Sequence, residues 1–261
     1  MKQVKEMGIV AVCLLLLGFG ICMGVGTFLM YRDGEQEYDT LREYVAVEEP
    51  KERKDGETPE ENQEETVTVD FEALKKINPE IIAWIRIPDT RIDYPVVQGT
   101  DNEYYLKHTF KKTEHVAGSI FLDAKSDRNF HDFYTVIMGH HMQGRKMFGD
   151  IDLYTDASFF EKNTTGTLYV EGRILKLETV AILKADAYDK YVYRTDWKEK
   201  EEKEELIRHI YELAVHTWGE RLTVEDQMIA LSTCSSGNTN GRHLLICKVI
   251  KENTVEGSET E

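Results

Sequence analysis

The stretch ALSTCSSGNTNGRHLLICKVI (Ala230–Ile250) holds two apolar runs joined by a loop of Ser, Gly and Asn. Apolar, partly β-branched runs of this length are typical of strands, and polar residues with Gly are typical of the turn between them. The stretch therefore predicts a hairpin. If its two strands are neighbours, Cys234 at the end of the first faces Arg242 at the start of the second.

Similar runs recur through the middle of the chain. Turn residues separate them, for example Pro88-Asp89 and Glu171-Gly172, and the pattern is typical of short strands. Eight runs predict a mainly β fold, a closed or nearly closed antiparallel barrel. The runs are AWIRI, RIDYPVV, GSIFLD, FYTVIM, GTLYVEG, ILKLETVAILKA, QMIALST and HLLICKVI.

Helices are expected at the periphery of this barrel. One short helix begins near Phe71 and ends before Pro79, because a proline disfavours helical geometry in the residue before it. A second helical interruption is expected in GRKMFGDIDLY and ASFFEKN. A third lies in residues 195–218, where apolar side chains recur at helical spacing on one face. These side chains are Leu206, Ile207, Ile210, Tyr211 and Ala214.

The N-terminal stretch from Met7 to Tyr31 carries no charged residue. A helix of this length crosses a hydrocarbon core about 30 Å thick. Because Lys2 and Lys5 precede it and acidic residues follow it, the positive-inside rule places the N-terminus in the cytoplasm and the rest of the chain outside. The alternative is a signal peptide cleaved near Gly24 or Gly26, and the long apolar region favours the uncleaved, single-pass anchor.

The distribution of charge indicates both the class of partner and the domain boundaries. The net charge of −16 argues against binding of nucleic acid, which needs a basic surface. Residues 32–66 carry 14 acidic and 5 basic side chains and indicate a solvated, flexible linker. The expected organisation is an anchor at 1–31, the linker at 32–66, a catalytic barrel at 67–253 and an acidic tail at 254–261.

The four cysteines divide into two pairs. Cys13 and Cys22 belong to the anchor, while Cys234 and Cys247 fall in the outer domain, where a disulfide is possible. Cys247 is expected to be buried in its strand, and so Cys234 is expected to be a free thiol. The chain has neither a Gly-rich phosphate loop nor Cys/His spacing typical of a metal site, and no cofactor or metal is expected.

A nucleophilic thiolate needs a base or a positive neighbour. His140 and His141 follow a predicted strand and a Gly, at a rim where side chains reach solvent, and Arg242 is a permanent cation suited to bind an oxyanion. Taken singly, each of these residues has an ordinary structural role. Their combination at strand ends of an exported barrel points to cysteine chemistry.

These residues resemble the motifs of the sortases, the transpeptidases of the Gram-positive cell surface. The family's TLxTC strand end corresponds to ALSTC, its downstream Arg to Arg242, and the class B YGH segment to MGHHM, so that His140 takes the catalytic place. Met138 replaces the usual Tyr and Ala230 the first Thr, and neither change removes a reacting group. The resemblance covers about Phe71 to Lys251 and implies an eight-stranded sortase barrel of class B type.

The resemblance also implies a mechanism. Cys234 attacks the Thr carbonyl of a C-terminal sorting signal on an exported protein, Arg242 holds the substrate and the oxyanion, and His140 protonates the leaving amine. An amine of a peptidoglycan precursor or of a pilin then takes the acyl group. The resemblance places four further residues in the substrate groove, although Thr195 is more readily explained as a helix N-cap. These residues are Ser232, Thr233, Asn102 and Thr195.

Two alternatives remain open. The same three residues with water as acceptor would make a surface cysteine peptidase, although papain-like peptidases place Cys before His in the sequence. A non-enzymatic anchored binding module would make Cys234 dispensable.

Overall fold

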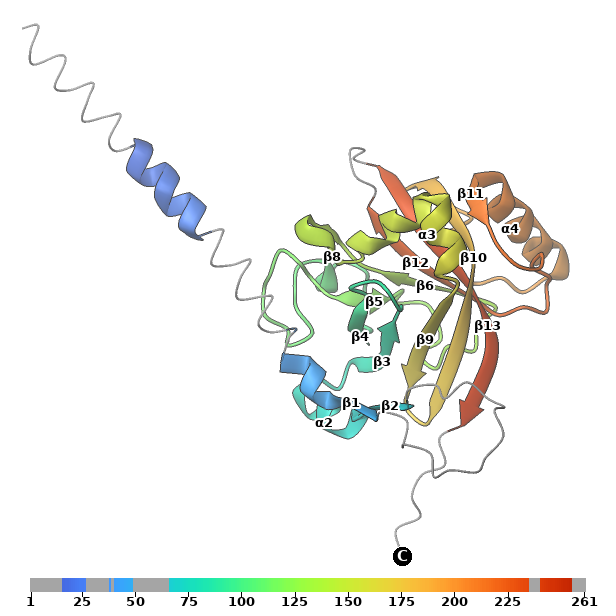
Figure 1. Ribbon diagram of the computed structural model, residues 1–261, viewed down its shortest axis with the longest axis horizontal. Coiled ribbons are helices and arrows are strands. Elements are labelled where there is room, and N and C mark those ends of the chain that lie inside the picture. The colour runs from blue at the N-terminus through green and yellow to red at the C-terminus, as the bar shows by residue number, and fades with distance from the viewer. Residues whose placement is uncertain (1–15, 27–37, 39, 49–65, 235–239, 255–261) are drawn as a thin grey trace, which may run out of the picture. The chain divides into compact units, whose positions relative to one another are not determined.

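The computed structural model describes residues 16–26, 38, 40–48, 66–234 and 240–254. Its main body is a sheet that closes on itself. The strands follow the order β11-β10-β13-β12-β6-β5-β4-β3-β9, and β9 also pairs with β10. Eight strands therefore form the ring, and β11 is added at the edge of β10 (Figure 1). The ring strands are β3 (Ile81–Arg86), β4 (Asp93–Val97), β5 (Ile120–Leu122), β6 (Tyr134–Met138), β9 (Thr165–Val170), β10 (Arg173–Asp186), β12 (Met228–Cys234) and β13 (Gly241–Thr254).

The eight predicted runs correspond to these eight ring strands, and the mainly β barrel is confirmed. The prediction of a fully antiparallel barrel is wrong, because β4 pairs with β5 and β6 pairs with β12 in parallel. Parallel neighbours need a long connection. Such a connection is present in both cases, since residues 98–119 separate β4 from β5 and about ninety residues separate β6 from β12.

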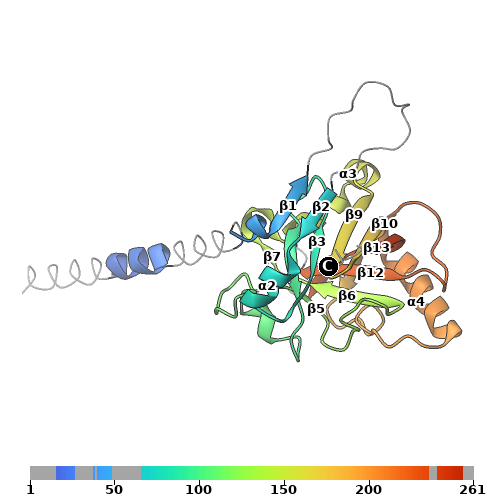
Figure 2. The same cartoon turned by 90° about the horizontal axis from the view of Figure 1, so that it is seen from below.

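Smaller elements surround the ring. Two further sheets each have two strands: β1 with β2, and β7 with β8. Figures 1 and 2 place α2 beside β1 and β2 and place α4 on the other side of the barrel, beside β10. The elements are η1 (Thr40–Tyr44), β1 (Val45–Glu48), β2 (Thr66–Val69), α2 (Phe71–Ile77), η2 (Tyr104–Leu106), β7 (His141–Met142), η3 (Gln143–Arg145), β8 (Lys146–Met147), η4 (Gly149–Thr155), α3 (Ala157–Lys162), α4 (Lys200–Leu213) and β11 (Ala214–Thr217).

Helix α4 packs on one face of the sheet. Leu206, Ile207 and Ile210 are buried in one cluster with residues of β6, β10, β12 and β13, as the helical spacing predicts. The predicted helix is too long at both ends. Glu199 caps it in a reciprocal arrangement with Glu202, so the N-cap assignment of Thr195 is wrong. At its other end, Ala214–Thr217 form β11 with alternating exposure, as expected for a strand with a β-branched residue at every second position.

The N-terminal region differs from its predicted boundaries. Residues of the expected linker form η1 and β1, and β1 pairs with β2 in an antiparallel register from Val45↔Val69 to Glu48↔Thr66. The compact unit that contains the barrel begins at Glu43 rather than at 67. The β-branched residues of VAVE and TVTV, Val in both runs and Thr in the second, favour this pairing. The rest of the expected linker and the tail from 255 lie outside the described residues.

The expected anchor is described only in its middle part, where residues 16–26 form a helix. Within the described ranges, no helix has both the length and the apolar character of a membrane span. The other residues of the predicted span, including Cys13, lie outside the described part of the chain.

Candidate active site

The hairpin of β12 and β13 pairs Cys234 directly with Arg242. Residues directly opposite each other on antiparallel strands lie on the same face of a sheet. That face also carries Ala230 and Ile246, which pack in the cluster under α4. The guanidinium of Arg242 is half-buried and donates to the carbonyl of Gly241 at 2.9 Å. The side chain of Cys234 and the loop residues 235–239 lie outside the described residues.

His140 reaches the same edge of the sheet through β6. Because β6 and β12 run parallel, their carboxyl ends meet, and the last register pair is Ser232↔Met138. The Gly139 amide then donates to the Ser232 carbonyl at 3.1 Å, which holds the chain beside β12 for one more residue. His140 follows directly, so three positions far apart in sequence converge: His140, Cys234 and Arg242.

A side chain immediately before His140 would displace its neighbours. A Cβ on Gly139 would overlap Cδ1 of Ile120 and lie 3.0 Å from Cδ2 of Phe148, two side chains without exposed surface. Phe148 in turn donates its amide to the His140 carbonyl at 3.0 Å. The close packing of Gly139 therefore sets the position of the His140 backbone.

The imidazole of His140 is held in one tautomer. Its Nε2 lies 2.7 Å from the carbonyl oxygen of Leu106, in the turn η2. A carbonyl only accepts, so Nε2 must carry a proton in both the neutral and the charged ring. Protonation and deprotonation then take place at Nδ1, which makes Nδ1 the atom suited to general acid and base work. His141 instead places Nε2 2.9 Å from Oδ2 of Asp152.

A cavity of about 910 Å³ lies next to this edge and contains two of the predicted groove residues, Asn102 and Thr195. Met138 and Tyr193 also line it, and the Tyr193 hydroxyl bonds to the Ser232 hydroxyl at 2.8 Å. Tyr193 thus links the cavity to β12. The sequence YVYRTDW did not indicate this role of Tyr193, because aromatic residues before a helix are common in protein cores.

The four residues predicted to line the substrate groove lie in different surroundings in the structure. Asn102 lines the cavity, but its amide is engaged, donating to Oδ2 of Asp123 at 2.6 Å and accepting from the Ala124 amide at 2.8 Å. Ser232 and Thr233 are buried, and neither is part of the cavity lining. Among the described residues the Thr233 hydroxyl has no hydrogen-bond partner.

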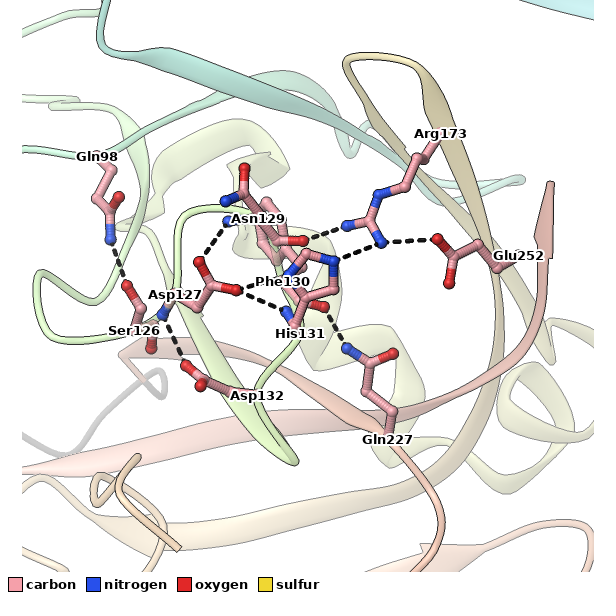
Figure 3. A network of polar contacts seen from close by, with 10 residues as sticks. All are labelled: Gln98, Ser126, Asp127, Asn129, Phe130, His131, Asp132, Arg173, Gln227 and Glu252. Atoms are coloured by element: carbon pink, nitrogen blue, oxygen red, sulfur yellow. Dashed lines mark hydrogen bonds and ion pairs between the residues drawn. The ribbon is translucent and has the colours of Figure 1, made fainter. Parts of the chain in front are cut away.

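The loop between β5 and β6 forms one wall of the cavity through Asp123, Lys125 and Asp132. A network of polar contacts ties this loop to the barrel (Figure 3). Asp132 accepts from the Asp127 amide at 2.7 Å. Burial raises the pKa of Asp127, but hydrogen bonds from Asn129 and His131 outweigh it and leave that pKa below its ordinary value. These hydrogen bonds hold the loop that forms this wall of the cavity.

Further contacts of the network reach three other parts of the barrel. Arg173 of β10 binds the Asn129 carbonyl and pairs with Glu252 of β13 at 2.6 Å, while Gln227 before β12 donates to the Phe130 carbonyl (Figure 3).

The cavity is strongly charged. Its lining includes four basic and three acidic side chains: Lys125, Lys190, Arg194, Lys198, Asp123, Asp132 and Asp196.

Cys247 contrasts with Cys234. It is a free, fully buried thiol, and burial raises its pKa to about 12. A thiol that stays protonated is a poor nucleophile. No group of three or more His, Cys, Asp or Glu side chains arranged to hold a metal ion occurs within the described ranges.

Comparison with known proteins is consistent with this geometry. The sortase domain matches residues 85–249. The sortase B of Listeria monocytogenes is 30% identical over 218 residues, which cover 83% of this chain and 87% of that protein. The crystal structure of Clostridium perfringens sortase B is 34% identical, with a TM-score of 0.65 over 69% of this chain and 99% of that one. The sortase B of B. anthracis is 27% identical, with a TM-score of 0.70 over 86% of this chain and 99% of that one. A domain match over more than half the chain, with relatives of class B spanning most of its length, places this chain in the sortase family of cysteine transpeptidases, among its class B-like members.

Proposed function

We propose that this protein is a membrane-anchored sortase that cleaves a C-terminal sorting signal of exported proteins and joins the new carboxyl end to an amine of a cell wall precursor. The observation that carries the proposal is the convergence of three strand ends. Cys234 and Arg242 are direct register partners, and His140 follows the parallel neighbour of the strand that bears Cys234.

In the first half-reaction the Cys234 thiolate attacks the carbonyl carbon of the sorting signal, and the negative charge on the carbonyl oxygen is stabilised by Arg242. The carbon–nitrogen bond then breaks, and His140 gives its Nδ1 proton to the leaving amine. The product is a thioester on Cys234. The Leu106 carbonyl keeps the other nitrogen of His140 protonated throughout, so a single nitrogen exchanges the proton.

In the second half-reaction an amine nitrogen attacks the thioester carbonyl and loses its proton to His140. The carbon–sulfur bond breaks and the thiolate is restored, which balances the cycle. The peptide substrate is assigned to the cavity beside Met138 and Tyr193, whose ordered wall costs little entropy on binding. Solved relatives include a Staphylococcus aureus sortase B–substrate complex and a sortase B complexed with triglycine.

The molecule that accepts the acyl group distinguishes a cell wall sortase from a pilin-polymerising sortase and from a peptidase. A class B sortase of Streptococcus pyogenes is described as involved in pilus biogenesis, so an amine of a pilin is the second candidate acceptor. Water as acceptor would give a peptidase.

The decisive experiment uses the full-length protein in detergent with peptides bearing NPxT-like and LPxT-like signals. We expect intact mass spectrometry to show a thioester adduct on Cys234 and the added Gly-peptide amine to appear in the product. The Cys234→Ala variant should form neither. Peptide release that no amine accelerates would identify a peptidase, and preference for a pilin Lys peptide would identify a polymerising enzyme.

The proposed location follows from Lys2, Lys5 and the uncharged run that ends at Tyr31. Protease added to intact protoplasts should remove the barrel and leave a short membrane fragment. A protected barrel, or a secreted product that begins after Gly26, would contradict the anchor.

A further inference from the structure

One carboxylate joins the segments that carry His140 and Arg242. Asp152, in η4, accepts from Nε2 of His141 at 2.9 Å with one oxygen and from Nδ1 of His243 at 2.6 Å with the other. His141 is the residue after His140, and His243 is the residue after Arg242. Asp152 therefore bridges the immediate neighbours of two proposed reacting groups.

The bridge lies on the face of the hairpin opposite the reacting positions. Successive residues of a strand point to opposite faces. Leu244 and Ile246 pack under α4, which places Arg242 on the α4 face and His243 on the other, where η4 contacts β12 and β13. The bridge can thus act on the active site only through the backbone.

The segment around His140 has few backbone bonds to the hairpin, so a side-chain link can help to fix its position. The ladder between β6 and β12 ends at Met138, and within the described residues the Gly139 amide makes the last backbone bond from this segment to β12. Beyond it, His141 pairs with Met147 of β8, which belongs to a separate two-stranded sheet. The link from His141 through Asp152 to His243 connects this small sheet to β13.

The bridge is built as a fixed structural unit. The side chain of His243 is only 9% exposed, and those of Asp152 and His141 are 24% and 26% exposed. Burial raises the pKa of Asp152, but the hydrogen bonds and charges of His243 and His141 outweigh it and hold this pKa below its usual range. The carboxylate therefore stays ionised and can accept both bonds at once.

We infer that Asp152 is a positioning residue of this sortase, which holds His140 in register with Cys234 and Arg242 by binding His141 and His243 from behind the hairpin. The inference rests on the proposed catalytic roles of those three residues. Asp152 touches neither substrate nor reacting atoms, so its loss should slow the chemical step and leave peptide binding nearly unchanged.

The test compares Asp152→Asn with Asp226→Asn in the full-length protein. Asp226 is a matched control, because it also has a lowered pKa and also anchors β13, through Lys248 at 2.8 Å, but in the middle of the strand, six residues from Arg242. An Asn at 152 has one accepting oxygen and an amide that only donates, so it can keep one bond with a histidine as donor, and the other only if that histidine changes tautomer. A small displacement of a reacting group can cost up to 10²-fold in rate, and we expect kcat to fall about 10-fold.

The expected pattern is specific to a positioning role. Both variants should lower the melting temperature by a few degrees, but only Asp152→Asn should lower kcat, with KM within about twofold of the parent. The double variant Asp152→Asn/His141→Ala should be no slower than the slower single variant, because both remove the same link. Unchanged kcat in Asp152→Asn, a loss confined to KM, an equal loss in Asp226→Asn, or multiplicative losses in the double variant would each overturn the inference.

Cys234→Ala, measured in parallel, separates this inference from the proposed function. Turnover that survives in Cys234→Ala would remove the proposed nucleophile. Full kcat in Asp152→Asn beside an inactive Cys234→Ala would leave the proposed function intact and remove only the role of Asp152.

Discussion

Replacement of Gly139 by Ala should damage both stability and catalysis, since this residue packs where a side chain has no room. The added Cβ would overlap Cδ1 of Ile120 and meet Cδ2 and Cγ of Phe148 at 3.0 and 3.1 Å. Overpacking a filled core costs about 1–3 kcal/mol. For a domain of this size each kcal/mol lowers the melting temperature by about 2–4 °C, so we expect a decrease of roughly 2–12 °C.

The catalytic loss should exceed what instability explains. The methyl group is blocked on one side by Cδ1 of Ile120 and so presses on Phe148, whose amide holds the His140 carbonyl. Because a shift of about 1 Å at a reacting group can cost up to 10²-fold, we expect kcat to fall at least about 10-fold at a temperature where Gly139→Ala is fully folded. The assays are peptide transpeptidation and thermal unfolding followed by circular dichroism.

A matched control and a rescue make the reasoning refutable. Gly166→Ala would bring a Cβ within 2.6 Å of Cδ1 of Ile87, a similar clash with an Ile terminus, but in β9 and outside the lining of the cavity beside the active site. It should lower stability and leave kcat within about twofold. Ile120→Val removes the clashing Cδ1 and should restore most of the kcat lost in Gly139→Ala. Equal kcat losses in both Ala variants, or no rescue by Ile120→Val, would refute the packing argument.

Three shorter predictions concern the two neighbouring histidines, Arg242 and the buried thiol of Cys247. His140→Ala should abolish measurable turnover, whereas His141→Ala should keep at least a tenth of kcat, and the reverse order would exchange their roles. Arg242→Lys keeps the charge but loses the planar fork, so transpeptidation should fall on the order of 10²–10³-fold while Cys234 still reacts with a methanethiosulfonate reagent. Cys247, with a pKa of about 12, is almost fully protonated at pH 8, and peptide mapping should find it unlabelled until the protein is unfolded.

The strands were predictable because their signal is local. Each of the eight ring strands is a run of β-branched and aromatic residues bounded by turn residues, and each run forms a strand. The direction of pairing carries no local signal. The parallel pairing of β6 with β12 depends on a partner about ninety residues away, and so the sequence suggested an antiparallel barrel throughout. The helical spacing of apolar residues runs on to Ala214, and so the sequence predicts helix where the structure has the short strand β11.

The candidate site was predictable to the extent that its chemistry resides in side chains. Cys234, His140 and Arg242 each carry a distinctive functional group at the end of a strand. The Leu106 carbonyl that sets the tautomer of His140 is a backbone atom, which any residue at that position would supply. Asp152 lies 91 residues from His243, within a segment whose acidic residues look like ordinary helix surface. Membership of the sortase family removes the binding-module alternative, while the choice of acceptor stays a prediction.

Side chains alternate between the two faces of the β12–β13 hairpin, and this alternation separates the residues proposed to react from the residues that position them. Positions on one face, Cys234 and Arg242, are assigned the reaction, while Thr233 and His243 on the other face are buried against the interior and η4. A substitution on the first face removes a reacting group, and one on the second changes only where that group stands. The two classes should therefore differ in how they respond to repair. A displaced group can be restored by a compensating change in the packing around it, as Ile120→Val should do for Gly139→Ala, whereas no change in packing can replace the thiol of Cys234.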